Sequence, residues 1–401
     1  MKKIIITIFL ICLLPFLLSA QEQNQSSPSK PPELKLVNTV PGAKLYKIGK
    51  FNVIELHGTF LEMGRQYGQL MKWELGDFYK IAVEEQLIKK NNLTFEQAKA
   101  IAGSIYRFYP KRFKDILIGM SETSGLPLEK VMILDQIEGI AKLGKTGVLC
   151  SGIAAWSDYT SNAPLVFGRN FDYPEYFSSF SPYLAVVVFN PVDSCNSAAI
   201  YGYIGHVSTF TGMNDAGIFL EMNNGADSGG KILYNNRISS FVLQLSYLFD
   251  FSSLSELDAA INTARNNWPL ILNVADAKSA YSYESATFAI LKRNADKPGL
   301  LVATNHFVNP EWGFELTDPN SEDLTVKRRI NLLALGEKYK GKIDASIMKQ
   351  ILDTKIEDGG ATASFTICQA VALPQELKLW IKAIDFQDWV LVDLKSLFSK
   401  K

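Results

Sequence analysis

The sequence has few of the residues that common catalytic sites require. Its 401 residues include only three histidines and four cysteines. It contains no His-Glu-x-x-His or Cys-x-x-Cys pair, no phosphate-binding glycine loop ending in Lys-Ser/Thr, and no Gly-x-Ser-x-Gly elbow. We therefore expect no metal site, no cofactor and no serine nucleophile of the elbow type.

A surplus of charge of either sign is also missing. Lys and Arg total 41, Asp and Glu total 41, and the net charge is zero. No basic run with interleaved aromatic residues occurs, so neither nucleic acid nor a strongly anionic partner is expected. The composition, 47% hydrophobic and 20% charged, is typical of a globular protein with a sizeable core.

One long hydrophobic run is present, and it lies at the N-terminus. A cationic start at residues 1–3 precedes an almost wholly apolar stretch over 4–20, which ends in small residues. This layout predicts a signal peptide over 1–20, followed by a flexible linker over 21–36, and hence a periplasmic or secreted protein. The alternative is a membrane anchor, because the run approaches spanning length. No later stretch predicts an integral membrane domain.

Export would leave an odd number of cysteines. Cleavage after residue 20 removes Cys12 and leaves Cys150, Cys195 and Cys368. At least one thiol is then unpaired or pairs with another chain. The unpaired thiol is either buried and inert or a nucleophile. A Cys195–Cys368 disulfide remains open, because the sequence does not give their separation.

The region before residue 150 has mainly helical periodicity. Short apolar alternations over 37–56 predict one or two strands. Apolar residues then recur at helical spacing over 60–90, and further helices are expected over 94–120 and 127–143. We therefore predict a mainly helical pro-segment over 37–149.

The pattern changes at Gly147, where short strands separated by turn residues begin. Predicted helices over 238–250, 255–264, 326–336 and 344–352 interrupt the strands. The predicted strands cover 148–156, 164–167, 183–189, 198–203, 207–211, 218–222, 365–373, 377–384 and 389–394, with others beginning near 270, 280, 288 and 300. Strands, helices, strands, helices and strands in this order predict an α+β catalytic domain over 150–401.

Cys150 stands at this change of pattern, in the segment 147–152 (GVLCSG), and the segment 168–172 (GRNFD) follows closely. Together they resemble the cysteine branch of the N-terminal-nucleophile hydrolases. That branch includes the cholylglycine hydrolases, N-acylethanolamine acid amidase and the autoproteolytic isopenicillin acyltransferases. Its members begin the mature catalytic chain with cysteine and carry a Gly-(Arg/Gln)-Asn-x-Asp signature near this spacing.

Weaker matches extend the resemblance over roughly residues 55 to 395. They include a turn, a strand ending in paired asparagines, a Thr-Asn-His segment, a late strand and the start of a pro-segment. These lie at 212–217 (GMNDAG), 223–224 (NN), 303–306 (ATNH), 365–370 (FTICQA) and 58–64 (GTFLEMG). Each match alone is weak, and their order and spacing support one another.

The resemblance implies a fold and a self-processing step. The fold is the αββα four-layer sandwich, in which two antiparallel sheets face each other and helices cover both outer faces. The Cys150 thiol would attack the carbonyl of Leu149, and hydrolysis would free the α-amine of Cys150. That amine has a reference pKa of about 7.7–8.0 and is suited to act as general base. No catalytic histidine is then needed.

The resemblance also implies roles for further residues. A guanidinium at Arg169 would favour the thiolate, and Asp172 would bind and orient the α-ammonium. Asn223 or Asn224, together with Asn305, would donate amide hydrogens to the tetrahedral oxyanion. The spacing of different relatives points to either of the paired asparagines, so both stay candidates.

Simpler interpretations of these residues exist. Cys150 could be a buried structural cysteine, and Arg169 and Asp172 could form a salt bridge at a turn. The asparagines are also typical turn residues. Arg328 and Arg329 lie in a predicted helix, where a solvated face is the usual environment and a substrate contact is the alternative.

Taken together, the sequence predicts an exported amide C–N hydrolase that acts on a small-molecule N-acyl amide and whose cleaved chains stay associated. Arg169 follows the cholylglycine form of the signature, where the acyltransferases of this branch have Gln, whereas the length of the pro-segment argues against the simple bile-salt hydrolases. Acyl transfer to an amine is therefore one alternative. The other is a non-catalytic exported binding protein of the same fold. Substrate identity and oligomeric state remain open.

Overall fold

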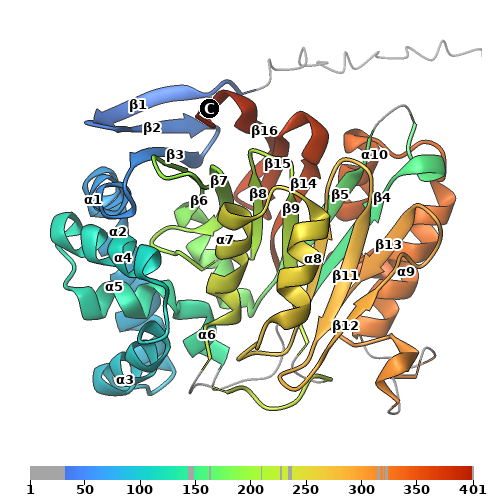
Figure 1. The fold of residues 1–401 in the computed structure, drawn as a ribbon, viewed down its shortest axis with the longest axis horizontal. Coiled ribbons are helices and arrows are strands. Elements are labelled where there is room, and N and C mark those ends of the chain that lie inside the picture. Colours follow the sequence, from blue (N-terminus) through green and yellow to red (C-terminus); the bar gives the residue numbers. More distant parts are fainter. Residues whose placement is uncertain are drawn as a thin grey trace, which may run out of the picture. The chain divides into compact units, whose positions relative to one another are not determined.

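Two β-sheets packed face to face form the centre of the protein in the computed structural model (Figure 1). The structure describes residues 32–142, 149–161, 164–208, 210–225, 228–233, 237–313, 317–318, 320 and 324–399. The predicted signal peptide and residues 21–31 of the predicted linker lie outside the described residues. The chain from Pro32 onward forms one compact unit.

The larger sheet has ten strands among the described residues. Neighbouring strands are antiparallel except β3 and β6, which run parallel. In spatial order the strands are β1 (Lys35–Val40), β2 (Ala43–Ile48), β3 (Phe51–Gly58), β6 (Leu184–Pro191), β7 (Ala198–Tyr203), β8 (Thr211–Asn214), β9 (Phe219–Asn224), β10 (Leu270–Ala275), β11 (Ala280–Ser285) and β12 (Ile290–Arg293).

The smaller sheet is antiparallel throughout the part of the chain that is described. In spatial order its strands are β13 (Leu300–Ala303), β4 (Cys150–Ala155), β5 (Val166–Asp172), β14 (Thr366–Leu373), β15 (Lys378–Ala383) and β16 (Gln387–Asp393). β4, which begins at Cys150, therefore lies between β13 and β5.

The two sheets meet through alternate residues of their strands. Phe167 of β5 packs on Phe219 of β9, with ring centroids 5.0 Å apart. Because side chains alternate along a strand, Arg169 lies on the same face as Phe167, and Glu221 on the same face as Phe219. The space between the sheets thus contains an apolar core and, toward one end of β5 and β9, a polar cluster.

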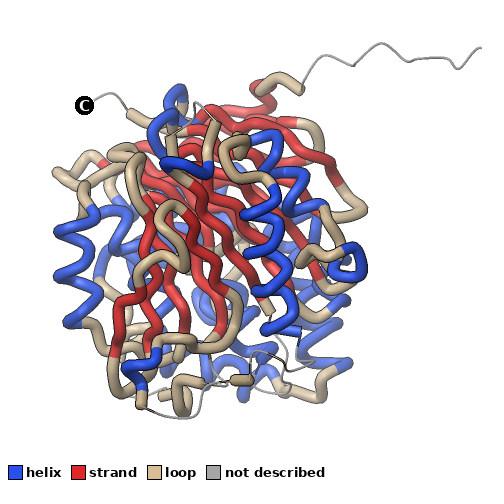
Figure 2. The backbone as a smooth tube through the Cα atoms, turned by 90° about the vertical axis from the view of Figure 1, so that its right-hand side faces the viewer, coloured by secondary structure: helices blue, strands red, loops and turns tan. Residues whose placement is uncertain are grey.

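Helices cover the outer face of each sheet, and Figure 2 shows strands between helices. On the larger sheet, α7 (Ser240–Asp250) contacts β7 and β8, and α8 (Leu254–Thr263) contacts β12. On the smaller sheet, α9 (Leu324–Lys338) contacts β13 and β4, and α10 (Ala345–Asp353) contacts β5 and β14. The predicted α+β, αββα four-layer sandwich is confirmed.

The N-terminal region contains strands as well as the predicted helices. The three predicted helices are each divided, giving α1 (Phe60–Leu70), α2 (Lys72–Phe78), a π-helix (Tyr79–Lys90), α3 (Phe95–Tyr106), α4 (Lys111–Ser124), α5 (Leu128–Asp135) and α6 (Ile137–Lys142). α3 and α4 are separate because Pro110, at the N-cap of α4, cannot donate a helical hydrogen bond.

The prediction of one or two strands over 37–56 was wrong, because β1, β2 and β3 all form there. β1 begins at Lys35, inside the predicted linker. These strands are an edge of the larger sheet, and β3 pairs with β6 over seven residues from Asn52 to Gly58. The N-terminal region is therefore built into the same sheet as the predicted catalytic region.

Candidate active site

Cys150 is the first residue of β4, and its side chain points into the space between the sheets. It is 1% exposed. Its backbone N–H donates to Asn305 Oδ1 at 2.9 Å. Its Sγ lies 3.7 Å from Arg169 Nη2 and 3.9 Å from the backbone oxygen of Asp172. Three of the residues predicted for the site therefore surround this cysteine.

Arg169 connects the thiol to a buried carboxylate on the opposite sheet. Its Nη1 donates to Glu221 and, at 2.9 Å, to the backbone oxygen of Met222. Both side chains of the Arg169–Glu221 ion pair are almost fully buried. The guanidinium also lies 5.5 Å from the ring centroid of Phe171. Arg169 thus spans the two sheets, with one nitrogen on the carboxylate and the other facing sulfur.

Glu221 was not predicted, although strand alternation places it on the inward face of β9. Asn273 of β10, its register partner, donates to Glu221, and Asn223 Nδ2 lies 3.4 Å from the same carboxylate. Burial raises the pKa of Glu221 to about 7, while Arg169 and the two asparagines act in the opposite direction. The sequence held a signal for this residue, because the alternation along 219–224 puts Glu221 on the same face as the apolar Phe219.

Asp172 ends β5 and makes different contacts from those expected. Its carboxylate accepts from Arg328 Nη1 at 2.8 Å and from Thr366 Oγ1 at 2.7 Å. The backbone nitrogen of Cys150 donates to Asn305 and not to Asp172. Burial raises the pKa of Asp172 to about 6, and Arg328 opposes the rise most strongly.

The expected solvated face for Arg328 was wrong, because this side chain is 0% exposed. Besides Asp172, it donates to the backbone oxygen of Cys150 at 3.0 Å and to Asn305 Oδ1 at 2.8 Å. A sequence signal existed: Arg328 shares its helical spacing with the buried Thr325, Leu332 and Leu335. Arg329 matches the expectation better, since it is partly exposed and pairs with Asp296.

Asn305 is held in one orientation by its neighbours. Its Oδ1 accepts from Cys150 N–H and Arg328, so the amide nitrogen must point away from both. That nitrogen donates to the backbone oxygen of Asn224 at 2.9 Å. The backbone N–H of Asn305 donates to Thr325 Oγ1 at 2.8 Å.

The paired asparagines have different environments. Asn223 is fully buried and lies on the inward face of β9, where its Nδ2 is 3.3 Å from the backbone oxygen of Ala303 in the smaller sheet. Asn224 lies on the other face, and its Oδ1 accepts from Trp268 Nε1 at 2.9 Å. The side chain of Asn223 therefore shares the space between the sheets with Arg169, whereas Asn224 contributes its backbone oxygen to Asn305.

The electrostatic environment of the Cys150 thiol contains opposing effects. Burial raises its pKa, Arg169 lowers it, and the charges of Asp172 and Glu221 raise it. A cavity of about 10 Å³ lies beside Phe171, Tyr203 and Cys368, enough for no more than about one water molecule. The thiol is therefore buried, and desolvation and the nearby arginine act on its pKa in opposite directions.

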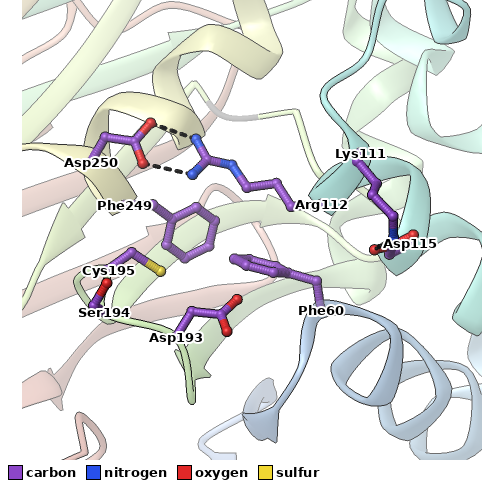
Figure 3. Close-up of a pocket in the computed structure, with 9 residues that line it drawn as sticks. All are labelled: Phe60, Lys111, Arg112, Asp115, Asp193, Ser194, Cys195, Phe249 and Asp250. Carbon is purple, nitrogen blue, oxygen red and sulfur yellow. Dashed lines mark hydrogen bonds and ion pairs between the residues drawn. The ribbon is translucent and has the colours of Figure 1, made fainter.

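The other two described cysteines are also free thiols, so the Cys195–Cys368 disulfide is not formed. Cys368 is buried on β14. Cys195 lies in a surface pocket of about 570 Å³ (Figure 3), beside Phe60, Asp193 and Phe249. None of the described residues lining that pocket belongs to the predicted site.

The three histidines have partners of their own: His57 contacts Glu55, His206 contacts Glu138, and His306 contacts Thr325. Within the described ranges, no group of three His, Cys, Asp or Glu side chains is arranged to hold a metal ion. No described helix has both the length and the apolarity that crossing a membrane requires.

Comparison with curated proteins finds two similar chains from Dictyostelium discoideum. Protein dcd1B is 23% identical over 260 residues, which cover 57% of this chain and 50% of the relative. Protein dcd1A is 24% identical over 210 residues, covering 44% of this chain and 46% of the relative. The chain thus spans about half the length of these relatives. No protein-family model matches the sequence.

Comparison with solved structures finds similar chains of 13–18% identity. A mutant conjugated bile acid hydrolase from Clostridium perfringens has a TM-score of 0.47 and covers 63% of this chain and 95% of its own. The N-acylethanolamine-hydrolyzing acid amidase ortholog of Caenorhabditis elegans gives 0.42, with 56% and 93% covered. Penicillin V acylase from Agrobacterium tumefaciens gives 0.44, with 63% and 89% covered.

Proposed function

We propose that this protein is a self-cleaving amide hydrolase whose nucleophile is the thiol of Cys150. The observation that supports this most directly is the set of contacts around one residue. The cysteine begins a strand, its sulfur faces a guanidinium, and its backbone nitrogen and oxygen are both held by side chains. A structural cysteine needs none of these polar contacts, whereas an N-terminal nucleophile uses all of them.

The proposed first step cleaves the chain before Cys150. The sulfur attacks the carbonyl carbon of Leu149, and the C–N bond between the two residues breaks as a thioester forms. The nitrogen takes up a proton and becomes the α-amine of Cys150. Water then hydrolyses the thioester, which returns the thiol and leaves a carboxylate on Leu149. Arg328 and Asn305 hold the Cys150 backbone during this change.

The second step repeats this chemistry on the substrate. The new α-amine removes the thiol proton, as its reference pKa of about 7.7–8.0 allows near neutral pH. The thiolate attacks the amide carbonyl, the amine leaves with a proton, and water hydrolyses the acyl-thioester. Arg169 lies where its charge stabilises the thiolate.

We assign the oxyanion donors to Asn305 and Asn223. Each amide nitrogen carries two hydrogens, and the Nδ2 of Asn305 uses one on Asn224. The Nδ2 of Asn223 makes two long contacts, to Glu221 and to the backbone oxygen of Ala303, and would exchange one of them for the oxyanion. Asn223 is favoured over Asn224 because its side chain lies between the sheets, whereas the Asn224 side chain binds Trp268 on the other face. Removing one such donor typically lowers transition-state stabilisation by about 2.7–4 kcal/mol.

We also propose that the cleaved chains stay associated and that the protein is exported. The pairing of β3 with β6 supports association, because separating the chains would break the larger sheet between its third and fourth strands. Asp135 of α5 adds a buried contact, since its Oδ1 accepts from the backbone of Val207 at 2.8 Å. Export depends on the N-terminal hydrophobic run alone.

The test is an amidase assay on a panel of N-acyl amino acids, conjugated bile acids, fatty amides and peptides. Wild type should release the amine from at least one class, and Cys150→Ala should release none. Cys195→Ala is the matched control and should keep wild-type turnover. Adding an amine acceptor separates hydrolysis from acyl transfer by the product formed. Full amidase activity in Cys150→Ala would refute the proposal.

A further inference from the structure

We propose that Glu221 is a positioning residue for the nucleophile. It holds Arg169 with one nitrogen facing the Cys150 sulfur, and its own negative charge competes with the thiolate for the same guanidinium. The proposal rests on the function proposed for Cys150. In physical terms, the guanidinium of Arg169 lies between the sheets and interacts with two acids, the Glu221 carboxyl group and the Cys150 thiol.

The position of Glu221 is fixed from several strands at once. Arg169 reaches it from β5, and Asn273 reaches it from β10. From β4, Gly152 approaches so closely that a Cβ at that position would lie 2.3 Å from Glu221 Oε1. The Glu221 carboxylate therefore has little room to move, and its ion pair with Arg169 restricts the guanidinium as well. A long arginine side chain is otherwise costly to hold in one orientation.

The charges that face this carboxylate come from the smaller sheet. Arg169 contacts it directly, and the Cys150 thiol faces another nitrogen of the same guanidinium. The charge of Arg169 also acts to lower the pKa of Asp172 and of the Cys368 thiol. The flanking residues on the larger sheet, Thr211 and Asn273, are neutral. With Glu221 ionised, the arginine charge is already balanced and a thiolate gains less from it. With Glu221 neutral, the whole charge acts on the sulfur.

Burial favours the neutral form of this acid, since it raises the pKa of Glu221 to about 7. The two acids therefore titrate as a coupled pair around Arg169, and losing a proton from one makes the second loss harder. A residue that merely filled space between the sheets would not affect the pH at which the thiol ionises.

The first experiment measures the rate at which iodoacetamide alkylates Cys150 as a function of pH, located by peptide mass spectrometry. Glu221→Gln keeps an oxygen that accepts from Arg169, and Asn273 can rotate its amide to accept from the new NH₂ group. The curve should move to lower pH, with alkylation about tenfold faster below its midpoint if the thiol pKa falls by one unit. Glu55→Gln, another buried acid of the larger sheet, is the matched control and should leave the curve unchanged.

A second variant tests position instead of charge. Gly152→Ala places a methyl group against the Glu221 carboxylate and should displace it. Arg169 then loses its main anchor, so alkylation of Cys150 should slow, which is opposite in sign to the effect of Glu221→Gln. Circular dichroism and thermal unfolding establish that each variant is folded.

The two variants separate the outcomes. A Glu221→Gln curve that superimposes on wild type or moves to higher pH overturns the proposal, and so does a Gly152→Ala protein that reacts at the wild-type rate. A Glu221→Gln chain that no longer processes contradicts it as well, because a more acidic thiol should process at least as fast. Alkylation reports on the thiol without any substrate. A panel with no turnover but the expected shifts would therefore refute the amidase and leave the role of Glu221 intact.

Discussion

Two buried arginine–carboxylate pairs lie on either side of Cys150, and they differ in what the arginine touches. Arg169 and Glu221 join the two sheets, and the free end of Arg169 faces the sulfur. Arg328 and Asp172 join α9 to the smaller sheet, and Arg328 binds the backbone oxygen of Cys150 and the side chain of Asn305. One arginine faces the sulfur of Cys150, and the other binds the backbone oxygen of Cys150.

The pairs also differ in their other hydrogen bonds. Asp172 accepts from Arg328 and from the Thr366 hydroxyl, so both of its oxygens have donors. Glu221 depends on Arg169 and on amide nitrogens of Asn273 and Asn223. Buried ion pairs seldom add much net stability, but breaking one is costly because it leaves a charge without a partner. The comparison predicts that damage to the Arg328 pair affects folding and processing, whereas damage to the Arg169 pair affects the thiol.

Arg328→Met should have the largest effect. It leaves Asp172 buried without its cation and removes the donors to Cys150 and Asn305, so we expect a loss of about 3–5 kcal/mol in unfolding free energy and little or no self-cleavage. Denaturant unfolding and intact mass measure the two effects. Arg329→Met, the neighbouring residue with a partly exposed ion pair, is the control and should lose less and still process. Equal losses of unfolding free energy and of self-cleavage in both variants would show that Arg328 has no specific role in holding Cys150.

Arg169→Met should have a smaller effect on stability and a large one on chemistry. Glu221 can take up a proton once its partner is lost, because burial already raises its pKa to about 7. The thiol loses the nearby positive charge, so its pKa should rise and alkylation of Cys150 at neutral pH should slow. The measurement is the alkylation rate against pH. Superimposable curves for two folded proteins would show that Arg169 does not tune the thiol.

The buried acids should also make stability depend on pH. Burial raises the pKa of Glu221 from 4.5 to about 7 and that of Asp172 from 3.8 to about 6. The folded protein therefore holds protons that the unfolded chain has lost, and unfolding free energy should fall as pH rises from about 4 to about 7. Glu221→Gln should flatten the upper part of this fall. An unchanged slope in denaturant titrations would argue against a raised pKa at Glu221.

Cys195→Ala should have the smallest effect of all. The side chain lies in a surface pocket beside Asp193 and Phe249, and it forms no disulfide. We expect wild-type processing and turnover, with a minor change in stability, measured by intact mass and the amidase assay. Loss of turnover in a folded Cys195→Ala protein would mean that the nucleophile has been assigned to the wrong cysteine.

The sequence was most informative where the site is local. Arg169 and Asp172 lie on one strand, in a short segment with a recognisable signature. The order of predicted strands and helices gave the α+β class, whereas the four-layer arrangement was implied by the family resemblance. Their actual partners could not be predicted in the same way, because Glu221 is 52 residues from Arg169 and Arg328 is 156 residues from Asp172. Such pairs depend on which strand and helix pack together, which periodicity does not give.

The division of the N-terminal region shows the same limit. Helical periodicity correctly located most of α1 to α6, because amphipathic spacing is a property of each segment. Pairing of β3 with β6 brings together residues more than a hundred positions apart, and nothing within 51–58 specifies that partner. The burial of Arg328 could have been predicted from the sequence, because Arg328 lies at helical spacing with the buried residues of α9.

The most direct test of the account is the intact mass of the purified protein, with N-terminal sequencing of every fragment. Wild type should yield two associated chains, the second beginning at Cys150, and Cys150→Ala should remain a single uncut chain. Comparable folding of the two proteins, shown by circular dichroism, makes the comparison valid. A wild-type protein that stays in one piece and still hydrolyses amides at full rate would contradict the central claim that Cys150 acts as an N-terminal nucleophile.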